Sequence, residues 1–165
     1  MEKIFYSFME TQFGTLLLAS TEKGMKRIML SGSNQLNQLR QEFGKNQLRE
    51  NKNFNENAAE QLRQYFQGKR KQFSLPLDLE GTDFQKQVLR AVQEVLYGTT
   101  QSYKEIAQKI GNPRAVRAVG NANRTNPLPI IIPCHRIIGS DGSMTGYGGG
   151  IDLKRKLLEF EKQHV

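Results

Sequence analysis

The chain has 165 residues, of which 37% are hydrophobic and 24% are charged, proportions typical of a soluble globular protein and not of a disordered or fibrous one. No apolar run approaches the about 18 residues of a membrane span, and the first residues lack the basic-then-apolar pattern of a secretion signal. The single cysteine excludes an internal disulfide, so we expect a protein of a reducing compartment, cytoplasmic or, in a eukaryote, nuclear.

Residues 1–80 are predicted to form a small α/β domain. Short β-rich runs at 4–8, 15–19 and 26–30 are separated by Gly14 and Gly24, which favours consecutive antiparallel strands. Helical periodicity follows at 36–43 and again at 58–66. The segment around Pro76 alternates like a strand, but its proline confines it to a sheet edge or a linker. This half contains no His or Cys, so we expect no metal site of the usual kind in it.

Residues 81–165 are predicted to form a second, mostly helical domain. Capping-box patterns begin at Thr82 and at Ser102, and each should open a helix. Asn112 followed by Pro113 indicates a third helix, from Pro113 to about residue 123. The second and third helices are joined by a short turn that contains glycine, which makes them a helix-turn-helix candidate.

The third predicted helix separates apolar from polar residues when it is projected at about 100° per residue. We expect its apolar side to pack on the preceding helix: Ala115, Val116, Val119 and Ala122. The opposite side is polar and contains no acid: Arg114, Arg117, Asn121 and Arg124. No acidic residue occurs between Glu105 and Asp141, whereas the net charge of the chain is +8. The pattern favours a helix that reads DNA, the alternative being a solvated basic face.

Cys134 is the candidate nucleophile. A lone cysteine is most often an inert small hydrophobic residue. Here the proline-rich stretch 127–133 fixes the backbone before it, and His135 and Arg136 after it should lower the pKa of the thiol. Six glycines between residues 139 and 150 surround Tyr147, a composition that lets main-chain amides approach a planar ligand.

Glu161 falls inside the apolar face of the predicted C-terminal helix, which Asp152 could cap. A buried carboxylate needs a charged or hydrogen-bonding partner. Lys154 projects to the same side but sits in the first turn, from where it could reach solvent. Pairing of Glu161 with His135 would give a carboxylate–imidazole–thiol arrangement. A structural ion pair with an arginine or a lysine is the equal alternative.

The segment Pro133-Cys134-His135-Arg136, preceded by 126–129 and followed by the glycine-rich 146–150, resembles the active-site signature of the O6-alkylguanine-DNA alkyltransferases. The resemblance extends over the second half, including Ser102-Tyr103 and residues 115–120. It implies an α/β (α+β) fold with a ribonuclease-H-like N-terminal domain and a winged-helix-like C-terminal domain with a helix-turn-helix. Leu96 departs from the proline of many relatives, and the N-terminal zinc site of some members cannot be built here.

The resemblance also assigns roles in the chemistry. Cys134 would accept the alkyl group, His135 would act through a water as its base, and Glu161 would hold His135. Asn126 would support the thiol, and Tyr103 would reach the flipped guanine and help to protonate it. The rest of the base pocket would come from main-chain groups of Ile137, Tyr147 and Gly148.

The remaining implied contacts are with DNA. Arg117 matches the arginine that replaces the extruded nucleotide, and further contacts are expected from Arg114, Asn121, Arg124, Ser102 and Arg136. The implied partner is duplex DNA that contains O6-alkylguanine, with O4-alkylthymine as a second candidate substrate. The implied protein is a monomer that acts once and needs no cofactor and no metal.

Two other functions remain open on the residues alone. A DNA-binding regulator or lesion-recognition module would use a structural cysteine. A cysteine hydrolase would use Cys134 with His135, although adjacent side chains of a strand point in opposite directions and that pair would need an irregular backbone.

Overall fold

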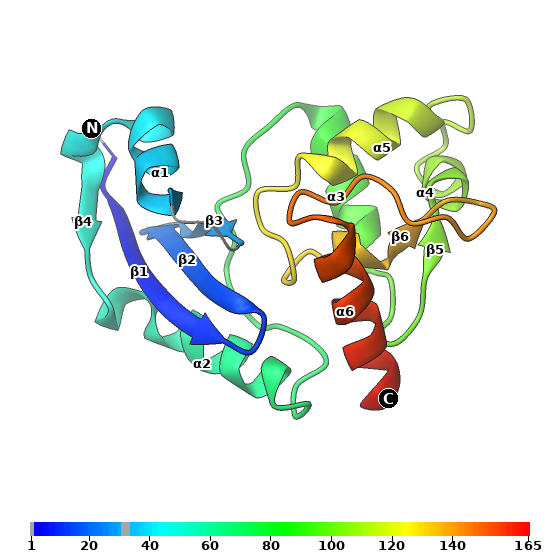
Figure 1. Cartoon of the computed structure of the whole chain (residues 1–165). Helices are drawn as coiled ribbons and strands as arrows, with labels where there is room; N and C mark the ends of the chain where they lie inside the picture. Colours follow the sequence, from blue (N-terminus) through cyan, green and yellow to red (C-terminus); the bar gives the residue numbers. More distant parts are fainter. Residues whose placement is uncertain (1, 31–33) are drawn as a thin grey trace. The chain divides into compact units, whose positions relative to one another are not determined.

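The computed structural model of the chain describes residues 2–30 and 34–165, and the chain divides into two compact units, residues 1–79 and 80–165 (Figure 1). The first unit combines a sheet with two helices, and the second is mostly helical. The predicted mixed α/β fold class is therefore confirmed. Within the described residues, no helix is both long and apolar enough to cross a membrane.

A four-stranded sheet of order β3-β2-β1-β4 forms the first unit. The strands β1 (Ile4–Thr11), β2 (Gly14–Thr21) and β3 (Gly24–Met29) are consecutive and antiparallel, as the sequence predicts. The sequence did not predict β4 (Leu48–Glu50), which pairs parallel to β1 and is too short to show a periodicity.

Gly24 explains how the segment around Pro76 joins β3. Its φ is +142°, and a Cβ at this position would lie 2.4 Å from the Pro76 carbonyl oxygen. The bare backbone lets Met25 donate a hydrogen bond to that oxygen at 2.9 Å, and Leu77 forms an isolated bridge with Met25. The segment is thus an edge contact with a single bridge, which fits its predicted place at a sheet edge.

Helices α1 (Gln35–Phe43) and α2 (Glu56–Phe66) complete the first unit, with the short 3-10 turns η1 (Lys45–Gln47) and η2 (Asn53–Asn55). Both helices agree with the predicted periodicity. A buried apolar cluster contains Leu39 of α1 together with residues from three strands: Ile4, Leu17, Ala19 and Leu48.

The second unit contains α3 (Asp83–Gln93), α4 (Tyr103–Lys109), α5 (Val116–Arg124) and α6 (Ile151–Gln163). The strands β5 (Gln101–Ser102) and β6 (Ile137–Ile138) pair in parallel, and the 3-10 turn η3 (Cys134–Arg136) directly precedes β6. The core of this unit contains fully buried apolar side chains from these elements and from the loop before η3: Val88, Leu89, Val92, Ile106, Val119, Leu128, Ile132, Ile137 and Leu157. This core fixes the two loops that carry the candidate site.

Two of the predicted helix starts in this unit are confirmed, and two are wrong. Thr82 caps α3, and Ser102 with Glu105 forms a full capping box on α4. However, α5 begins at Val116, because residues 112–115 close a separate turn in which Ala115 donates to the Asn112 carbonyl at 3.0 Å. Val116 is consequently 36% exposed and not packed as predicted.

The start of α6 also differs from the prediction. The capping residue is Gly150, with a φ of +95°, and Asp152 lies in the first turn instead of capping the helix. A carboxylate in the first turn still interacts favourably with the helix dipole, so Asp152 supports the N-terminus without capping it.

Asn55 is a buried polar hub that ties η2 to β1 and β2. Its amide nitrogen donates to the Phe5 carbonyl at 3.1 Å, to the Ser7 hydroxyl at 3.2 Å and to the Leu18 carbonyl at 3.2 Å. Its amide oxygen accepts a hydrogen bond from the Ser20 hydroxyl at 2.5 Å. A side chain that is 1% exposed thus satisfies groups on two strands at once.

We predict that Asn55→Ala lowers the free energy of unfolding of the first unit by roughly 2–3 kcal/mol, because it leaves buried polar groups without partners. Asn53→Ala, at an exposed position of the same turn, is the matched control and should change it by less than about 0.5 kcal/mol. Native-state hydrogen exchange of the β1 and β2 amides measures both effects. Equal exchange in the two variants would contradict the role of Asn55 as a hub.

Candidate active site

Cys134 follows a tight loop that Asn126 closes. The amide oxygen of Asn126 accepts a hydrogen bond from Leu128 N at 2.9 Å, and its amide nitrogen donates to the Ile132 carbonyl at 2.8 Å. Within this loop Ile130 has a φ of +75°, a conformation that a β-branched residue rarely adopts. The strain is held by the buried apolar packing of residues 128–133. Asn126 therefore supports the backbone that presents the thiol.

The thiol of Cys134 is buried, with 4% of the residue exposed. Burial raises the pKa of the thiol to about 11, against the opposing effects of the Asn126 amide and the Lys154 ammonium. The sequence predicted a lowered pKa for this thiol, and that prediction is wrong, because desolvation outweighs the lowering by nearby positive charge. The sulfur is held in a polar setting, but it is protonated and not exposed.

His135 and Glu161 form a buried pair, with His135 Nε2 and Glu161 Oε2 2.6 Å apart and neither side chain exposed. Burial lowers the pKa of His135, despite the opposing effect of Glu161, so the imidazole is neutral. Its Nε2–H then donates to the carboxylate, and Nδ1 carries the lone pair. Nδ1 is buried and has no hydrogen-bond partner among the described residues. The ring is thus oriented with its basic nitrogen available to accept a proton.

Arg136 holds the other side of the same carboxylate. Its Nε donates to Glu161 Oε1 at 2.8 Å and its Nη2 to Oε2 at 2.9 Å, while Gly98 N–H donates to Oε1 at 3.3 Å. Burial alone would raise the pKa of Glu161, but His135 and Arg136 hold it well below its usual range. Both partners that the sequence offered for Glu161, an imidazole and an arginine, are therefore used.

The predicted DNA contacts of Arg136 and Ser102 need correction. Arg136 is 4% exposed, and its Nη1 donates to the Val95 carbonyl at 2.8 Å, so its guanidinium is held inside the unit. Ser102 is also buried, and its hydroxyl accepts the Glu105 N–H at 3.0 Å as the cap of α4. Neither side chain is available to a phosphate.

Tyr103 lies half-buried at the start of α4, where its hydroxyl donates to the Thr145 carbonyl at 2.8 Å. Burial raises the pKa of Tyr103, which keeps the phenol protonated and able to donate. The glycine-rich loop passes close by, since a Cβ on Gly146 would lie 3.5 Å from the hydroxyl. The structure therefore brings Tyr103 together with the loop that the sequence indicated.

Lys154 is a site residue that the sequence did not single out. It is fully buried instead of reaching solvent, and its Nζ contacts the Ile137 carbonyl, the Thr145 carbonyl and the Tyr103 hydroxyl at 2.5, 2.9 and 3.3 Å. The sequence did contain an indication, because Lys154 projects to the same side of α6 as Glu161. The Ile137 carbonyl, predicted to face a base edge, already accepts this hydrogen bond.

Asn123 is a second residue that the sequence did not single out. It is fully buried on α5, and its amide nitrogen donates to the Cys134 carbonyl at 3.2 Å. This bond connects the helix with the polar stripe directly to the backbone of the nucleophile. No local pattern marks it, because its partner is distant along the chain.

The remaining predicted pocket residues lie on the glycine-rich loop. Tyr147 is 8% exposed, its hydroxyl has no hydrogen-bond partner among the described residues, and burial raises its pKa well above the usual value. A Cβ on Gly148 would lie 3.6 Å from the Arg124 carbonyl oxygen, so the loop runs close to the end of α5.

The polar stripe of α5 is exposed. Arg117, Asn121 and Arg124 lie on the helix and Arg114 in the turn before it. Within this set, Arg124 Nη2 donates a hydrogen bond to Asn121 Oδ1 at 2.7 Å. In the described part of the chain, none of these arginines forms an ion pair. The stripe is thus a positive surface that a polyanion can approach.

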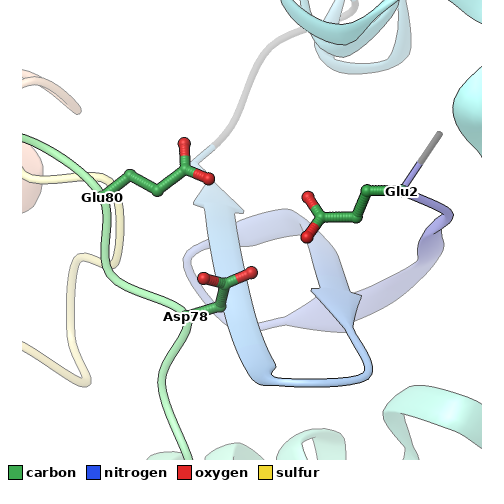
Figure 2. A group of neighbouring side chains, drawn as sticks. All are labelled: Glu2, Asp78 and Glu80. Carbon is green, nitrogen blue, oxygen red and sulfur yellow. The ribbon is translucent and has the colours of Figure 1, made fainter.

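Figure 2 shows three carboxylates, Glu2 and Asp78 of the first unit and Glu80 at the start of the second. In the first unit, the buried Lys26 Nζ lies 3.3 Å from Glu2 and 3.5 Å from Asp78, and the Thr21 hydroxyl donates to Asp78 at 2.6 Å. The ammonium of Lys26 already pairs with Glu2 and Asp78, so we assign no metal ion to these residues.

Comparison with known proteins agrees with this arrangement. The family profile "6-O-methylguanine DNA methyltransferase, DNA binding domain" matches residues 83–163, and the profile of the same family's "ribonuclease-like domain" matches residues 4–79. A methylated-DNA–protein-cysteine methyltransferase of Methanosarcina barkeri is 49% identical over 163 residues, which cover 98% of this chain and 99% of that protein. A constitutive methyltransferase of the same name from Bacillus subtilis is 42% identical, with 96% of this chain and 95% of that protein covered.

The solved structures give the same answer for the fold. The crystal structure of the Mycobacterium tuberculosis O6-methylguanine methyltransferase is 40% identical, covers 98% of this chain and 94% of its own, and has a TM-score of 0.87. The same mycobacterial protein in complex with DNA gives a TM-score of 0.86 at 41% identity, with the same coverage. Since the family's two profiles together span nearly all of the sequence, the chain belongs to the 6-O-methylguanine DNA methyltransferase family.

Proposed function

We propose that this chain repairs O6-alkylguanine in duplex DNA by transferring the alkyl group to Cys134, the activity after which its relatives are named. The single observation that carries the proposal is the relay around the thiol. Glu161 accepts a hydrogen bond from the Nε2–H of His135, and this leaves Nδ1 as a buried base on the residue that follows Cys134.

The thiol reaches its base indirectly. Among the described residues there is no direct hydrogen bond between the Cys134 thiol and the His135 imidazole, so the proton passes through a bridging water from Sγ to Nδ1. His135 becomes an imidazolium, and the carboxylate of Glu161 stabilises it. The thiolate then displaces the guanine oxygen at the alkyl carbon.

The leaving guanine takes a proton from Tyr103. Protonation avoids the release of a purine anion into a buried site, where an unpaired charge is costly. The product is a thioether, and no group in the site can cleave its carbon–sulfur bond, so each molecule reacts once. This stoichiometry distinguishes the protein from a cysteine hydrolase, which must regenerate its thiol.

The exposed stripe of α5 binds the DNA. An alkyl group on a stacked guanine is out of reach of a buried sulfur, so the nucleotide must leave the helix at a cost of a few kcal/mol. Arg117 enters the stack in its place, and Arg114, Asn121 and Arg124 contact the backbone. Binding by α5 in the minor groove would give little sequence readout, as suits a protein that scans for damage. A reducing compartment, cytoplasm or nucleus, would keep the acceptor thiol usable.

Cys134→Ala should abolish transfer but retain DNA binding. Incubation with duplex DNA that contains O6-methylguanine should add the mass of one methylene group to the wild-type peptide that contains residue 134, and nothing to the variant. A mass gain elsewhere, or binding by the wild type without modification, would favour the regulator hypothesis. Release of free product with turnover would favour the hydrolase.

Arg117→Ala should slow repair of duplex DNA about 10- to 100-fold, because the flipped state loses its replacement in the stack. Reaction with free O6-benzylguanine, which needs no flipping, should change by less than about twofold. Single-turnover kinetics on the two substrates measure the difference. An equal loss on both would remove the role of Arg117 in flipping.

Iodoacetamide should alkylate Cys134 slowly in the folded protein at neutral pH, because the raised pKa leaves little thiolate. The rate should rise about tenfold per pH unit from pH 7 to about pH 10 without a plateau. In urea the alkylation rate of the same thiol should reach half of its plateau value near the ordinary pKa of 9.0. A plateau below pH 9 in the folded protein is the result that contradicts a buried, protonated thiol.

A further inference from the structure

A pocket of the first unit is lined by positive charge. It has a volume of about 400 Å³ and lies where α1, η1 and β4 meet β1 (Figure 1). Its lining consists of one aromatic ring, one amide, one aliphatic side chain and three cations: Tyr6, Asn46, Leu48, Arg40, Lys45 and Arg49. Among the described residues, no carboxylate belongs to this lining. Like charges around one hollow repel each other, so the arrangement favours an anion between them.

The three cations of the pocket form no ion pair within residues 2–30 and 34–165. Other arginines of the same unit do form ion pairs, since Arg27 binds Glu42, and Arg63 binds Glu60 at 2.9 Å. A carboxylate is thus present on α1 only two residues from Arg40, but it is used by another partner. The cations of the pocket are exposed, and their charged groups remain available to a ligand.

The backbone around Arg49 holds its guanidinium in place. Nη1 of Arg49 donates to the Asn46 carbonyl at 3.0 Å and to the Leu48 carbonyl at 2.9 Å. These bonds fix the side chain beside η1 and leave its Nε and Nη2 without a partner in the described part of the chain. A guanidinium that is already fixed loses less conformational entropy when it binds a phosphate, so the site is partly preorganised.

Two aromatic rings of β1 continue from the pocket along the strand. Tyr6 and Phe8 lie two residues apart and therefore on the same face of the strand, with ring centroids 6.1 Å apart and planes at 81°. Tyr6 lines the pocket and packs partly against the apolar cluster of α1, whereas Phe8 is 42% exposed. Exposed rings beside a basic groove are typical of surfaces that bind single-stranded nucleic acid.

A single strand matches this surface better than a duplex or a free phosphate does. A duplex keeps its bases stacked and paired, so the rings could not stack on them. A free phosphate would use the cations and leave the exposed ring of Phe8 without a contact. A single strand offers phosphates to the cations and unstacked bases to the rings, and both groups repeat along it.

We propose that the pocket and Phe8 together form a second nucleic-acid site, whose ligand is a single-stranded segment. Its phosphates bind the three cations, and successive bases stack on Tyr6 and Phe8. We call this site the β1–β4 surface. It does not depend on the proposed alkyl transfer, because all of its residues belong to the first unit and none of them takes part in the chemistry at Cys134.

Amide chemical shifts during a titration with oligothymidylate would report this site and α5 separately. The amides of η1, β4 and β1 should shift with a dissociation constant of their own. Lys45→Gln should weaken binding at these amides about three- to tenfold and lower the salt dependence, the slope of log K against log salt, by about 0.7, because one phosphate contact is lost. Lys69→Gln, at an exposed position outside the pocket, is the matched control and should leave both values unchanged.

The stacking part of the proposal is tested at Phe8. Phe8→Ser should weaken binding of oligothymidylate to the β1–β4 surface about tenfold, because one base loses its platform. Phe8→Tyr keeps a ring and should bind like the wild type. Because Phe8 is exposed and lies outside the apolar cluster of α1, both variants should keep the fold of the first unit. Equal weakening in the two variants would exclude a stacking role.

Three further results would overturn the inference. Shifts confined to α5 would show that the β1–β4 surface does not bind the strand. Equal affinity of this surface for thymidine monophosphate, or for a duplex of the same length, would show that a strand is not what it recognises. Equal weakening by Lys45→Gln and Lys69→Gln would reduce the effect to net charge. Failure of the wild type to react with O6-benzylguanine would refute the proposed alkyl transfer alone and would leave these titrations unaffected.

Discussion

The site depends on one buried carboxylate. Glu161 receives a two-bond fork from Arg136, the Nε2 proton of His135 and the N–H of Gly98. Contacts with His135 and Arg136 hold the pKa of Glu161 well below its usual range, so the carboxylate stays ionised in spite of burial. Burial lowers the pKa of His135 and outweighs the opposing effect of the Glu161 carboxylate, so the imidazole stays neutral. The same contacts fix its tautomer, and this makes Nδ1 the base.

A buried, protonated thiol is consistent with a protein that reacts once. A thiolate exposed in the free protein would be open to oxidation and to small electrophiles, and each such event would destroy one acceptor irreversibly. Burial at Cys134 raises the pKa and prevents this loss. The Asn126 amide and the Lys154 ammonium oppose the effect of burial on this pKa without outweighing it. The free protein therefore keeps its acceptor as a thiol, the less reactive form.

The sequence predicted what local rules determine. Capping at Ser102, the periodicity of the helices and the strand order β1-β2-β3 depend on neighbours in the chain. The directions in which the side chains of Arg136 and Lys154 point do not depend on neighbours in the chain. In a 3-10 turn, successive side chains point about 120° apart. Arg136 can therefore be buried next to Cys134, although the sequence predicted that it contacts DNA. Both residues find partners on other elements, which no window of sequence reports.

The two buried cations of the site differ in a way that matches their positions. Arg136 pairs with the carboxylate of Glu161, whose two oxygens match the two parallel N–H groups of a planar guanidinium. Lys154 Nζ has three oxygen partners, two main-chain carbonyls and the Tyr103 hydroxyl, and the compact ammonium matches such a set better than a planar guanidinium. The chemistry of each cation, and not the amount of positive charge, therefore accounts for its place.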